Sequence, residues 1–337
     1  MKKIRIGIAG LGRMGQIHLR NIHRYFPEAE VTAVVDKVKQ HAEKIAVEFH
    51  INTVPDSFEE MVESQEIDAV VISSPTDTHA MYIEMAASAG RDIFCEKPFD
   101  LSLSKTRNAH VKAEQAGVKL MTGFNRRFDP EFQKIKTMVD SGSIGKTEII
   151  KITSRDPAPP SVEFLASSGG LFADMTIHDF DMARYISGTE VKEVYAVGKV
   201  MVDKAIGELG DIDTAITTLT FEDDTLAVID NSRRAVYGYD QRLEVFGSKG
   251  MVQAGNMLHD THCLTDVNGI HGALPLDFFM DRYATSYLNE MEVFIRLLQK
   301  GEEAPVTGHD CLMAIAIAQA ATASVKENRP VRLTEII

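Results

Sequence analysis

The chain has 337 residues, enough for two domains that each bury a core. It carries 36 Lys and Arg against 49 Asp and Glu, a net charge of −13, and shows no basic stripe, which argues against nucleic acid or an anionic membrane as a partner. No apolar segment is long enough to span a bilayer, and the three widely spaced cysteines make no disulfide framework, so we expect a cytoplasmic protein.

The first predicted elements are a strand over residues 4–9 and a helix that begins after a glycine-rich turn. Gly10, Gly12 and Gly15 give the pattern G-x-G-x-x-G between strand and helix, which is typical of dinucleotide-binding sites. In that pattern the first glycine makes the turn, the second lets the backbone approach a pyrophosphate, and the third allows close packing of helix on strand. We therefore expect this turn to bind a dinucleotide cofactor along its backbone, with Leu11, Arg13 and Met14 as its other residues.

The second predicted strand ends at Asp36, twenty-one residues beyond Gly15. An acid at this position hydrogen-bonds the adenosine ribose hydroxyls and repels a 2′-phosphate. The sequence therefore predicts NAD in preference to NADP, a preference that the neighbouring Lys37 softens.

Strands and helices alternate as far as residue 122. A capping-box start at Ser57 and Glu60, a buried strand before Ser73, a helix over residues 78–89 and a strand ending near Lys97 indicate a doubly wound parallel sheet. Such α/β sheets bind ligands outside the carboxyl ends of their strands. The candidate cofactor residues at those ends are Ser73, Ser74, Pro75, Glu96, Lys97 and Asn125. We assign residues 1–122 to this NAD-binding domain.

Beyond residue 122 the pattern changes to strand-like alternation. Asp129 and Pro130 start a helix, five alternating segments lie between residues 147 and 247, and helical patterns return over residues 278–299 and 310–327. This order predicts an α+β domain over residues 123–337, in which a large, mostly antiparallel open sheet carries helices on one face. We expect the two domains to meet over a cleft.

A candidate catalytic pair lies in the helical pattern around residue 178. Asp174 and His178 are four residues apart, so both side chains are expected on one helix face, with Gly188 as the C-terminal cap. A carboxylate beside an imidazole is suited to taking a proton from a hydroxyl. The alternative is an ordinary side-chain pair on one helix with no catalytic role. The dinucleotide motif favours the catalytic interpretation.

Lys97 is a candidate for the same chemistry, because an ammonium at a cofactor-binding strand end can stabilise a developing alkoxide. The alternative is that Lys97 is an exposed lysine at a strand end with no role in catalysis. No metal site is predicted, since His259, His262 and Cys263 lack a second spaced pair of ligands.

Seven segments of the chain form a recognisable set: AGLGRMG with His18, SSPTDTH, CEKP, GFNRRFD, SRDPAPP, GGLFADMTIHDFD and YGYDQRLEVFGSKG. Together they resemble the glucose-fructose oxidoreductase/inositol dehydrogenase/MocA family, and within it the inositol 2-dehydrogenases. The resemblance covers essentially the whole chain. It implies a catalytic group of Lys97, Asp174 and His178, and a cofactor site that includes His79. It also implies polyol contacts from Asp156, Arg126 or Arg127, Tyr237 or Tyr239, and Tyr287, with the register of the paired residues open.

The expected activity is NAD-dependent oxidation of myo-inositol to 2-keto-myo-inositol. A dehydrogenase of the same family that acts on scyllo-inositol or an aldose is the nearer alternative, and a non-catalytic dinucleotide-binding regulator is the remote one. The resemblance also implies a homotetramer formed through the open sheet of the second domain.

Overall fold

The computed structural model describes residues 3–337, which form two compact units. Unit 1 comprises Met1–Asn125 and Ser286–Met313, and unit 2 comprises Arg126–Thr285 and Ala314–Ile337. The sequence predicts a single boundary after residue 122, whereas residues 286–313 return to unit 1. The physical reason is packing: the rings of Phe94 and Phe294, both fully buried, lie 5.6 Å apart, so the returning segment completes the core of unit 1.

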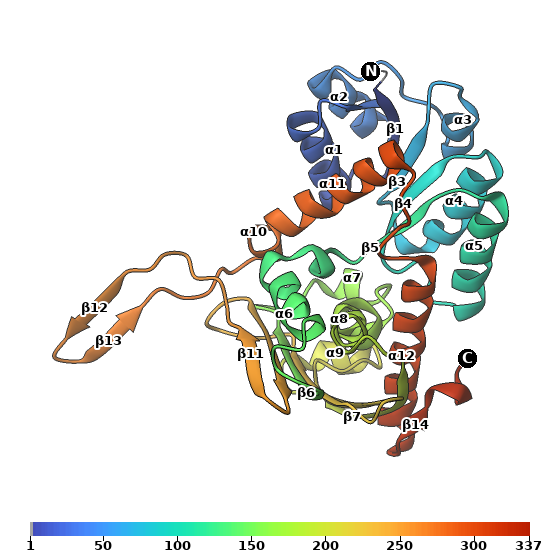
Figure 1. Ribbon diagram of the computed structural model, residues 1–337. Helices are drawn as coiled ribbons and strands as arrows, with labels where there is room; N and C mark the ends of the chain where they lie inside the picture. The colour runs from blue at the N-terminus through green and yellow to red at the C-terminus, as the bar shows by residue number, and fades with distance from the viewer. Residues whose placement is uncertain (1–2) are drawn as a thin grey trace. The chain divides into compact units, whose positions relative to one another are not determined.

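Unit 1 is built on a five-stranded parallel sheet with the order β2-β1-β3-β4-β5 (Figure 1). The strands are β1 (Ile4–Ala9), β2 (Ala29–Val35), β3 (Ala69–Ile72), β4 (Asp92–Glu96) and β5 (Leu120–Gly123). Every residue of the central strand β3 is buried, as expected for a sheet covered on both faces. The predicted doubly wound parallel sheet is confirmed.

Helices connect these strands and cover the sheet. They are α1 (Arg13–Tyr25), α2 (Lys39–Phe49), α3 (Phe58–Glu63), α4 (Thr76–Ser88) and α5 (Leu103–Ala116), joined by α11 (Ala284–Lys300) from later in the chain. The predicted start at Ser57 is confirmed: its side chain accepts a hydrogen bond from the Glu60 backbone N–H, and the Glu60 carboxylate accepts one from the Asp56 N–H.

Unit 2 contains a seven-stranded sheet with the order β11-β10-β6-β9-β8-β7-β14. The strands are β6 (Thr147–Arg155), β7 (Val191–Lys199), β8 (Thr214–Phe221), β9 (Leu226–Ser232), β10 (Asp240–Gly247), β11 (Gly250–Ala254) and β14 (Val331–Arg332). All neighbouring strands run antiparallel except β6 and β9. The predicted second sheet, large and mostly antiparallel, is confirmed.

The other elements of the second half lie around this sheet. They are η1 (Asn125–Phe128), α6 (Pro130–Asp140), α7 (Val162–Leu165), η2 (Phe172–Thr176), α8 (Ile177–Ser187), α9 (Lys204–Glu208), α10 (Phe279–Arg282), α12 (Gly308–Glu327) and η3 (Leu333–Glu335). Helix α8 packs on β6. Asp129 caps α6 by accepting hydrogen bonds from the Glu131 and Phe132 N–H groups, so the start predicted at Asp129 and Pro130 is confirmed.

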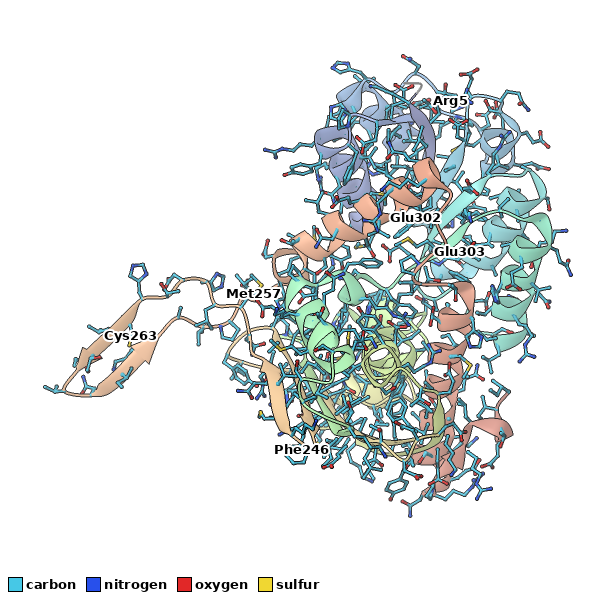
Figure 2. All side chains as sticks on the ribbon, viewed as in Figure 1. Arg5, Phe246, Met257, Cys263, Glu302 and Glu303 are labelled. Atoms are coloured by element: carbon cyan, nitrogen blue, oxygen red, sulfur yellow. The ribbon has the colours of Figure 1, made fainter. Side chains whose placement is uncertain are left out.

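A hairpin of β12 (Cys263–Asp266) and β13 (Gly269–Gly272) projects from the unit that holds the seven-stranded sheet (Figure 1). Its residues are exposed, and Cys263 lies on its first strand (Figure 2). No helix within residues 3–337 is both long enough and apolar enough to cross a bilayer.

Candidate functional site

The glycine turn of unit 1 has a geometry that only small residues allow. Gly10 has φ of +86°, and a Cβ on it would lie 2.5 Å from the Ser74 backbone. A Cβ on Gly15 would lie 1.9 Å from the Gly10 carbonyl oxygen, so helix α1 packs directly on the turn. A Cβ on Gly12 would meet nothing within 4 Å, which leaves this side of the turn open. The turn therefore has the space that a pyrophosphate needs.

The N-terminus of α1 faces the same turn, because Gly12 is its N-cap and offers no side chain. Leu11 is fully buried, whereas Arg13 is exposed and Met14 is half-buried in the first helical turn. The first N–H groups of a helix carry partial positive charge and favour an anion. An anionic pyrophosphate fits this end of α1.

Asp36 follows β2 and is tied to the glycine turn. Its carboxylate accepts a hydrogen bond from the Leu11 N–H at 2.7 Å and another from the Val38 N–H at 2.9 Å. The acid at the end of the second strand thus lies beside the first glycine of the motif. This is the position from which a carboxylate reaches a ribose.

Polar side chains after β3 contact the glycine turn and the first turn of α4. The Ser73 hydroxyl donates to the Gly10 carbonyl at 2.9 Å, and the Ser74 and Thr78 hydroxyls lie 2.6 Å apart. Pro75 is the N-cap of α4.

The His79 ring lies between two loops, with its nitrogens 2.7 Å from the Ser74 carbonyl oxygen and 2.8 Å from the Pro98 carbonyl oxygen. Burial lowers the pKa of this imidazole. His79 therefore joins the loop after β3 to the loop that carries Lys97.

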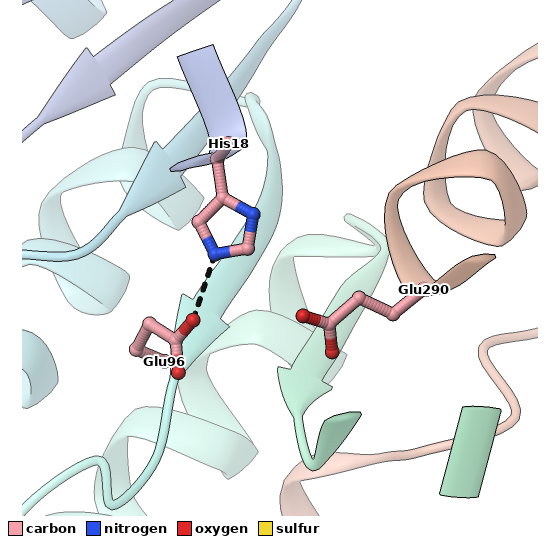
Figure 3. Close-up of side chains that lie close together, drawn as sticks. All are labelled: His18, Glu96 and Glu290. Atoms are coloured by element: carbon pink, nitrogen blue, oxygen red, sulfur yellow. Dashed lines mark hydrogen bonds and ion pairs between the residues drawn. The ribbon is translucent and has the colours of Figure 1, made fainter. Parts of the chain in front are cut away.

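Lys97 is half-buried directly after β4. The preceding Glu96 places its Oε1 2.7 Å from His18 Nε2 on α1. His18, Glu96 and Glu290 on α11 form a group whose donor atoms all lie within 4.8 Å of one another (Figure 3). Among residues 3–337 this is the only such group of three or more His, Cys, Asp or Glu side chains. Sequence reasoning did not anticipate this group, because its members are far apart along the chain.

The Asp174 and His178 segment in unit 2 is helical but not uniformly α-helical. Residues Phe172–Thr176 form a π-helical turn that continues into α8, and Gly188, with φ of +72°, ends α8 as the sequence predicts. Asp174 and His178 are both half-buried. A π-helical turn within a helix is often found at functional sites.

Arg233 is a site residue that sequence reasoning missed. It is fully buried after β9, and its Nη1 and Nη2 each donate to Asp174 Oδ2 at 3.2 Å. The sequence shows it only as half of a local Arg-Arg pair, and no short-range pattern indicates its long-range partner.

Asp156 follows β6 close to these charges. Burial raises the pKa of its carboxyl to about 7; the positive charge of Arg233 opposes the rise, and the negative charge of Asp174 adds to it. A carboxyl that titrates near neutrality beside an Asp174–Arg233 ion pair is typical of a functional site.

Arg126 and Arg127 are both buried against acids of α8. Arg126 Nη1 lies 2.5 Å from Asp179 Oδ1, and Arg127 donates to both Asp181 oxygens at 2.6 and 2.9 Å. Asp179 also accepts from Asn231 Nδ2 at 2.8 Å. These ion pairs connect η1 with α8, so both arginines contact the same helix.

The tyrosines that the sequence singles out are distributed over both units. The Tyr237 hydroxyl donates to Asp240 at 2.6 Å, and the buried Tyr239 ring lies edge-on to Tyr283. Tyr287 lies in unit 1, where its ring is edge-on to His18. Asn125, at the end of unit 1, is buried, and its Nδ2 finds no acceptor among the described residues.

Comparisons with known proteins match both units to families of oxidoreductases. Residues 4–124 match the model of the oxidoreductase family with an NAD-binding Rossmann fold, and residues 132–253 match that of the GFO/IDH/MocA C-terminal domain. Myo-inositol 2-dehydrogenase of Thermotoga maritima is 47% identical over 99% of this chain and 100% of its own length. Inositol 2-dehydrogenase of Rhizobium meliloti is 45% identical over 98% of this chain and 99% of its own.

A solved structure extends the likeness to the fold. Scyllo-inositol dehydrogenase from Lactobacillus casei, with bound NAD(H) and scyllo-inositol, superposes with a TM-score of 0.91 at 31% identity. The match covers 99% of this chain and 100% of that one.

Proposed function

The chain belongs to the GFO/IDH/MocA oxidoreductase family, and we propose that it oxidises myo-inositol to 2-keto-myo-inositol (scyllo-inosose) with NAD⁺. The observation that carries the proposal is its identity of 47% and 45%, over nearly the full length, with two proteins named as inositol 2-dehydrogenases. The site chemistry agrees, because carboxylate, guanidinium, imidazole and ammonium groups suit a ring rich in hydroxyls.

NAD is the cofactor, and the residues of unit 1 fit it. We propose that the open side of the glycine turn and the N-terminus of α1 hold the pyrophosphate, through Gly10, Leu11, Gly12, Arg13, Met14 and Gly15. Asp36 binds the adenosine ribose. The nicotinamide side is bordered by Ser73, Ser74, Pro75, His79, Glu96, Lys97 and Asn125. When bound, NAD⁺ supplies the hydride acceptor.

The proposed proton chemistry rests on Asp174, His178 and Lys97. A neutral His178 ring nitrogen takes the proton of a ring hydroxyl, and the Asp174 carboxylate stabilises the imidazolium that forms. Lys97 donates a hydrogen bond to the substrate oxygen and stabilises its developing negative charge. Lys97 belongs to unit 1, whereas Asp174 and His178 belong to unit 2.

The buried ion pair with Arg233 supports the role of Asp174. Two nitrogens of one planar guanidinium donate to the same oxygen of Asp174, so the buried positive charge of Arg233 favours the ionised form of this carboxylate and holds it in place. Orientation of the base by a third group is the usual arrangement in general acid–base catalysis.

We propose Asp156 as a polyol contact, because its carboxyl lies in the field of Arg233 and Asp174. The remaining proposed contacts are Arg126 or Arg127, Tyr237 or Tyr239, and Tyr287. Both arginines already bind acids, so a substrate hydroxyl would share a guanidinium with Asp179 or Asp181.

A second candidate substrate is scyllo-inositol, favoured by the ligand of the Lactobacillus casei relative. An aldose substrate and a non-catalytic regulatory role are weaker candidates, since no contact in the site favours either. Initial-rate measurements of kcat/KM for myo-inositol, scyllo-inositol, glucose and a 2-hydroxy acid, at one pH with NAD⁺ and NADP⁺, separate them. We expect the highest value for myo-inositol with NAD⁺. A higher value for scyllo-inositol moves the assignment to that isomer, and oxidation of no polyol at all removes the substrate proposal.

We also propose that the chain assembles as a homotetramer through the open face of the seven-stranded sheet. Cross-strand register brings the exposed side chains of Met251, Phe246, Ile149 and Leu226 into one row over four strands (Figure 2 labels Phe246). An apolar row of this kind on a sheet face is typical of an interface. Light scattering of the purified protein measures the mass of the assembly, and Phe246→Glu is expected to lower this mass.

No disulfide joins Cys95, Cys263 or Cys311 within residues 3–337, which suits the proposed cytoplasmic location.

A further inference from the structure

Three ionisable side chains meet in the core of unit 1 behind Lys97. His18 on α1 and Glu290 on α11 are both 0% exposed, and Glu96 at the end of β4 is 12% exposed. Glu290 lies on the buried face of α11, between Tyr287 and Phe294, and apart from Ser286 the other buried residues of this helix are apolar or aromatic. A glutamate at this position is unusual, because an unpaired buried carboxylate is strongly unfavourable.

The contacts of the group are unequal. Glu96 Oε1 is 2.7 Å from His18 Nε2, whereas neither carboxylate oxygen of Glu290 has a hydrogen-bond partner among the described residues. Figure 3 shows the Glu290 carboxylate facing the His18 and Glu96 pair, and the donor atoms of all three lie within 4.8 Å of one another. Of the two carboxyl groups, only that of Glu96 is hydrogen-bonded to the imidazole.

We propose that Glu290 is a positioning acid: it stays un-ionised beside the Glu96 carboxylate, and so avoids a charge repulsion that would displace the strand end that carries Lys97. This inference rests on the proposed role of Lys97. A charge-neutral carboxylic acid removes the repulsion between two like charges in a medium of low dielectric.

The electrostatic surroundings agree with this assignment. Burial, and then the negative charge of Glu96, raise the pKa of Glu290 well above that of an ordinary glutamate. The other ionisable groups near Glu96 are Lys97, the buried His79, whose pKa responds to both Glu96 and Lys97, and the Cys95 thiol, whose pKa burial raises. Within residues 3–337, none of these groups hydrogen-bonds Glu290.

The first test measures the proton on Glu290 without any turnover. The infrared spectrum of the unmodified protein minus that of Glu290→Gln at pH 7 is expected to show the carbonyl stretch of an un-ionised carboxylic acid, because the subtraction cancels the bands of other un-ionised carboxyls such as Asp156. Glu292→Gln, an exposed glutamate on the same helix, is the matched control and leaves the band unchanged. Absence of the band overturns the proposal. So does a stoichiometric divalent metal in the purified enzyme together with a chelator-induced loss of thermal stability, because the same three donors would then bind a cation.

The second test uses stability. A folded-state pKa above the unfolded value means that stability falls as pH rises, from the unfolded pKa up to the folded one. The melting temperature of Glu290→Gln minus that of the unmodified protein should therefore increase from pH 5 to pH 9. A difference independent of pH overturns the proposal.

The third test asks whether Glu290 positions Lys97. We expect kcat of the unmodified enzyme to fall at alkaline pH as Glu290 ionises, and Glu290→Gln to move this fall to higher pH while KM for NAD⁺ stays within about twofold. If kcat of Glu290→Gln falls at the same alkaline pH as kcat of the unmodified enzyme, the positioning role is overturned. If no polyol is oxidised, the infrared and stability results still decide whether Glu290 is un-ionised, so the two proposals fail separately.

Discussion

Both terminal nitrogens of Arg233 lie 3.2 Å from the same carboxylate oxygen of Asp174. The two residues are 59 positions apart, one directly after β9 and the other in the π-helical turn before α8. The guanidinium is fully buried and the Asp174 side chain is 19% exposed. The ion pair thus anchors the carboxylate of the proposed catalytic pair to the sheet.

Replacing Arg233 with Met should reduce both stability and turnover. Breaking a buried ion pair costs about 3–5 kcal/mol, and we expect the lower end because Asp174 is partly exposed. Chemical denaturation and kcat measure the two effects. Arg234→Met, at the exposed neighbouring position, is the control and should change neither. A stable variant with normal kcat would show that Asp174 needs no anchor.

Replacing Asp36 with Ala should weaken the binding of NAD⁺ and improve the relative use of NADP⁺. The carboxylate that bonds the ribose and repels a 2′-phosphate is lost, and so are the hydrogen bonds from the Leu11 and Val38 N–H groups. The ratio of kcat/KM for the two cofactors is the readout, with Glu43→Ala on the exposed side of α2 as the control. An unmodified enzyme that already prefers NADP⁺ contradicts this role of Asp36.

His178→Ala and Lys97→Ala should each lower turnover and leave NAD⁺ binding nearly intact. General acid–base catalysis contributes about 10²- to 10⁴-fold, which sets the expected loss for His178. Asp174→Asn should also be slow, because the imidazolium loses its counter-charge. Single-turnover rates and the Kd for NAD⁺ separate chemistry from binding. Near-normal chemistry in any of the three variants removes that residue from the mechanism.

Below the alkaline pH range in which Glu290 ionises, the oxidation rate should rise with pH, and the rate of inosose reduction should fall. Oxidation needs neutral His178 as base, whereas reduction needs the protonated ring and consumes a proton overall. Rate profiles in both directions from pH 5.5 to 9 test this. Parallel profiles in the two directions would argue against a histidine base.

Asp156 should add a second, separable pH dependence. Its pKa of about 7 lies above that of an unfolded aspartate, so its contribution to stability is present at acid pH and is lost as pH rises toward 7. Asp156→Asn should make the melting temperature less dependent on pH over this range. It should also raise KM for the polyol more than KM for NAD⁺. An unchanged KM for the polyol would place Asp156 outside the substrate site.

The dinucleotide half of the protein is predictable from local sequence. The strand, the three glycines and Asp36 are close along the chain, and each has a backbone requirement that a short pattern expresses, such as the positive φ of Gly10. The capped starts at Ser57 and Asp129 and the strand alternation of unit 2 are equally local, which is why both sheets were predictable.

Only the tertiary structure decided which side chains pair over long distances. The contacts of Arg233 with Asp174, of Arg126 with Asp179 and of Glu290 with the His18 and Glu96 pair depend on strand order and on the return of α11 to the first unit. Periodicity specifies which face of an element is buried, but any of several acids on that face satisfies the same pattern. Which acid meets which base is set by the packing of elements distant in sequence, and the charge state of Asp156 and Glu290 follows from that burial.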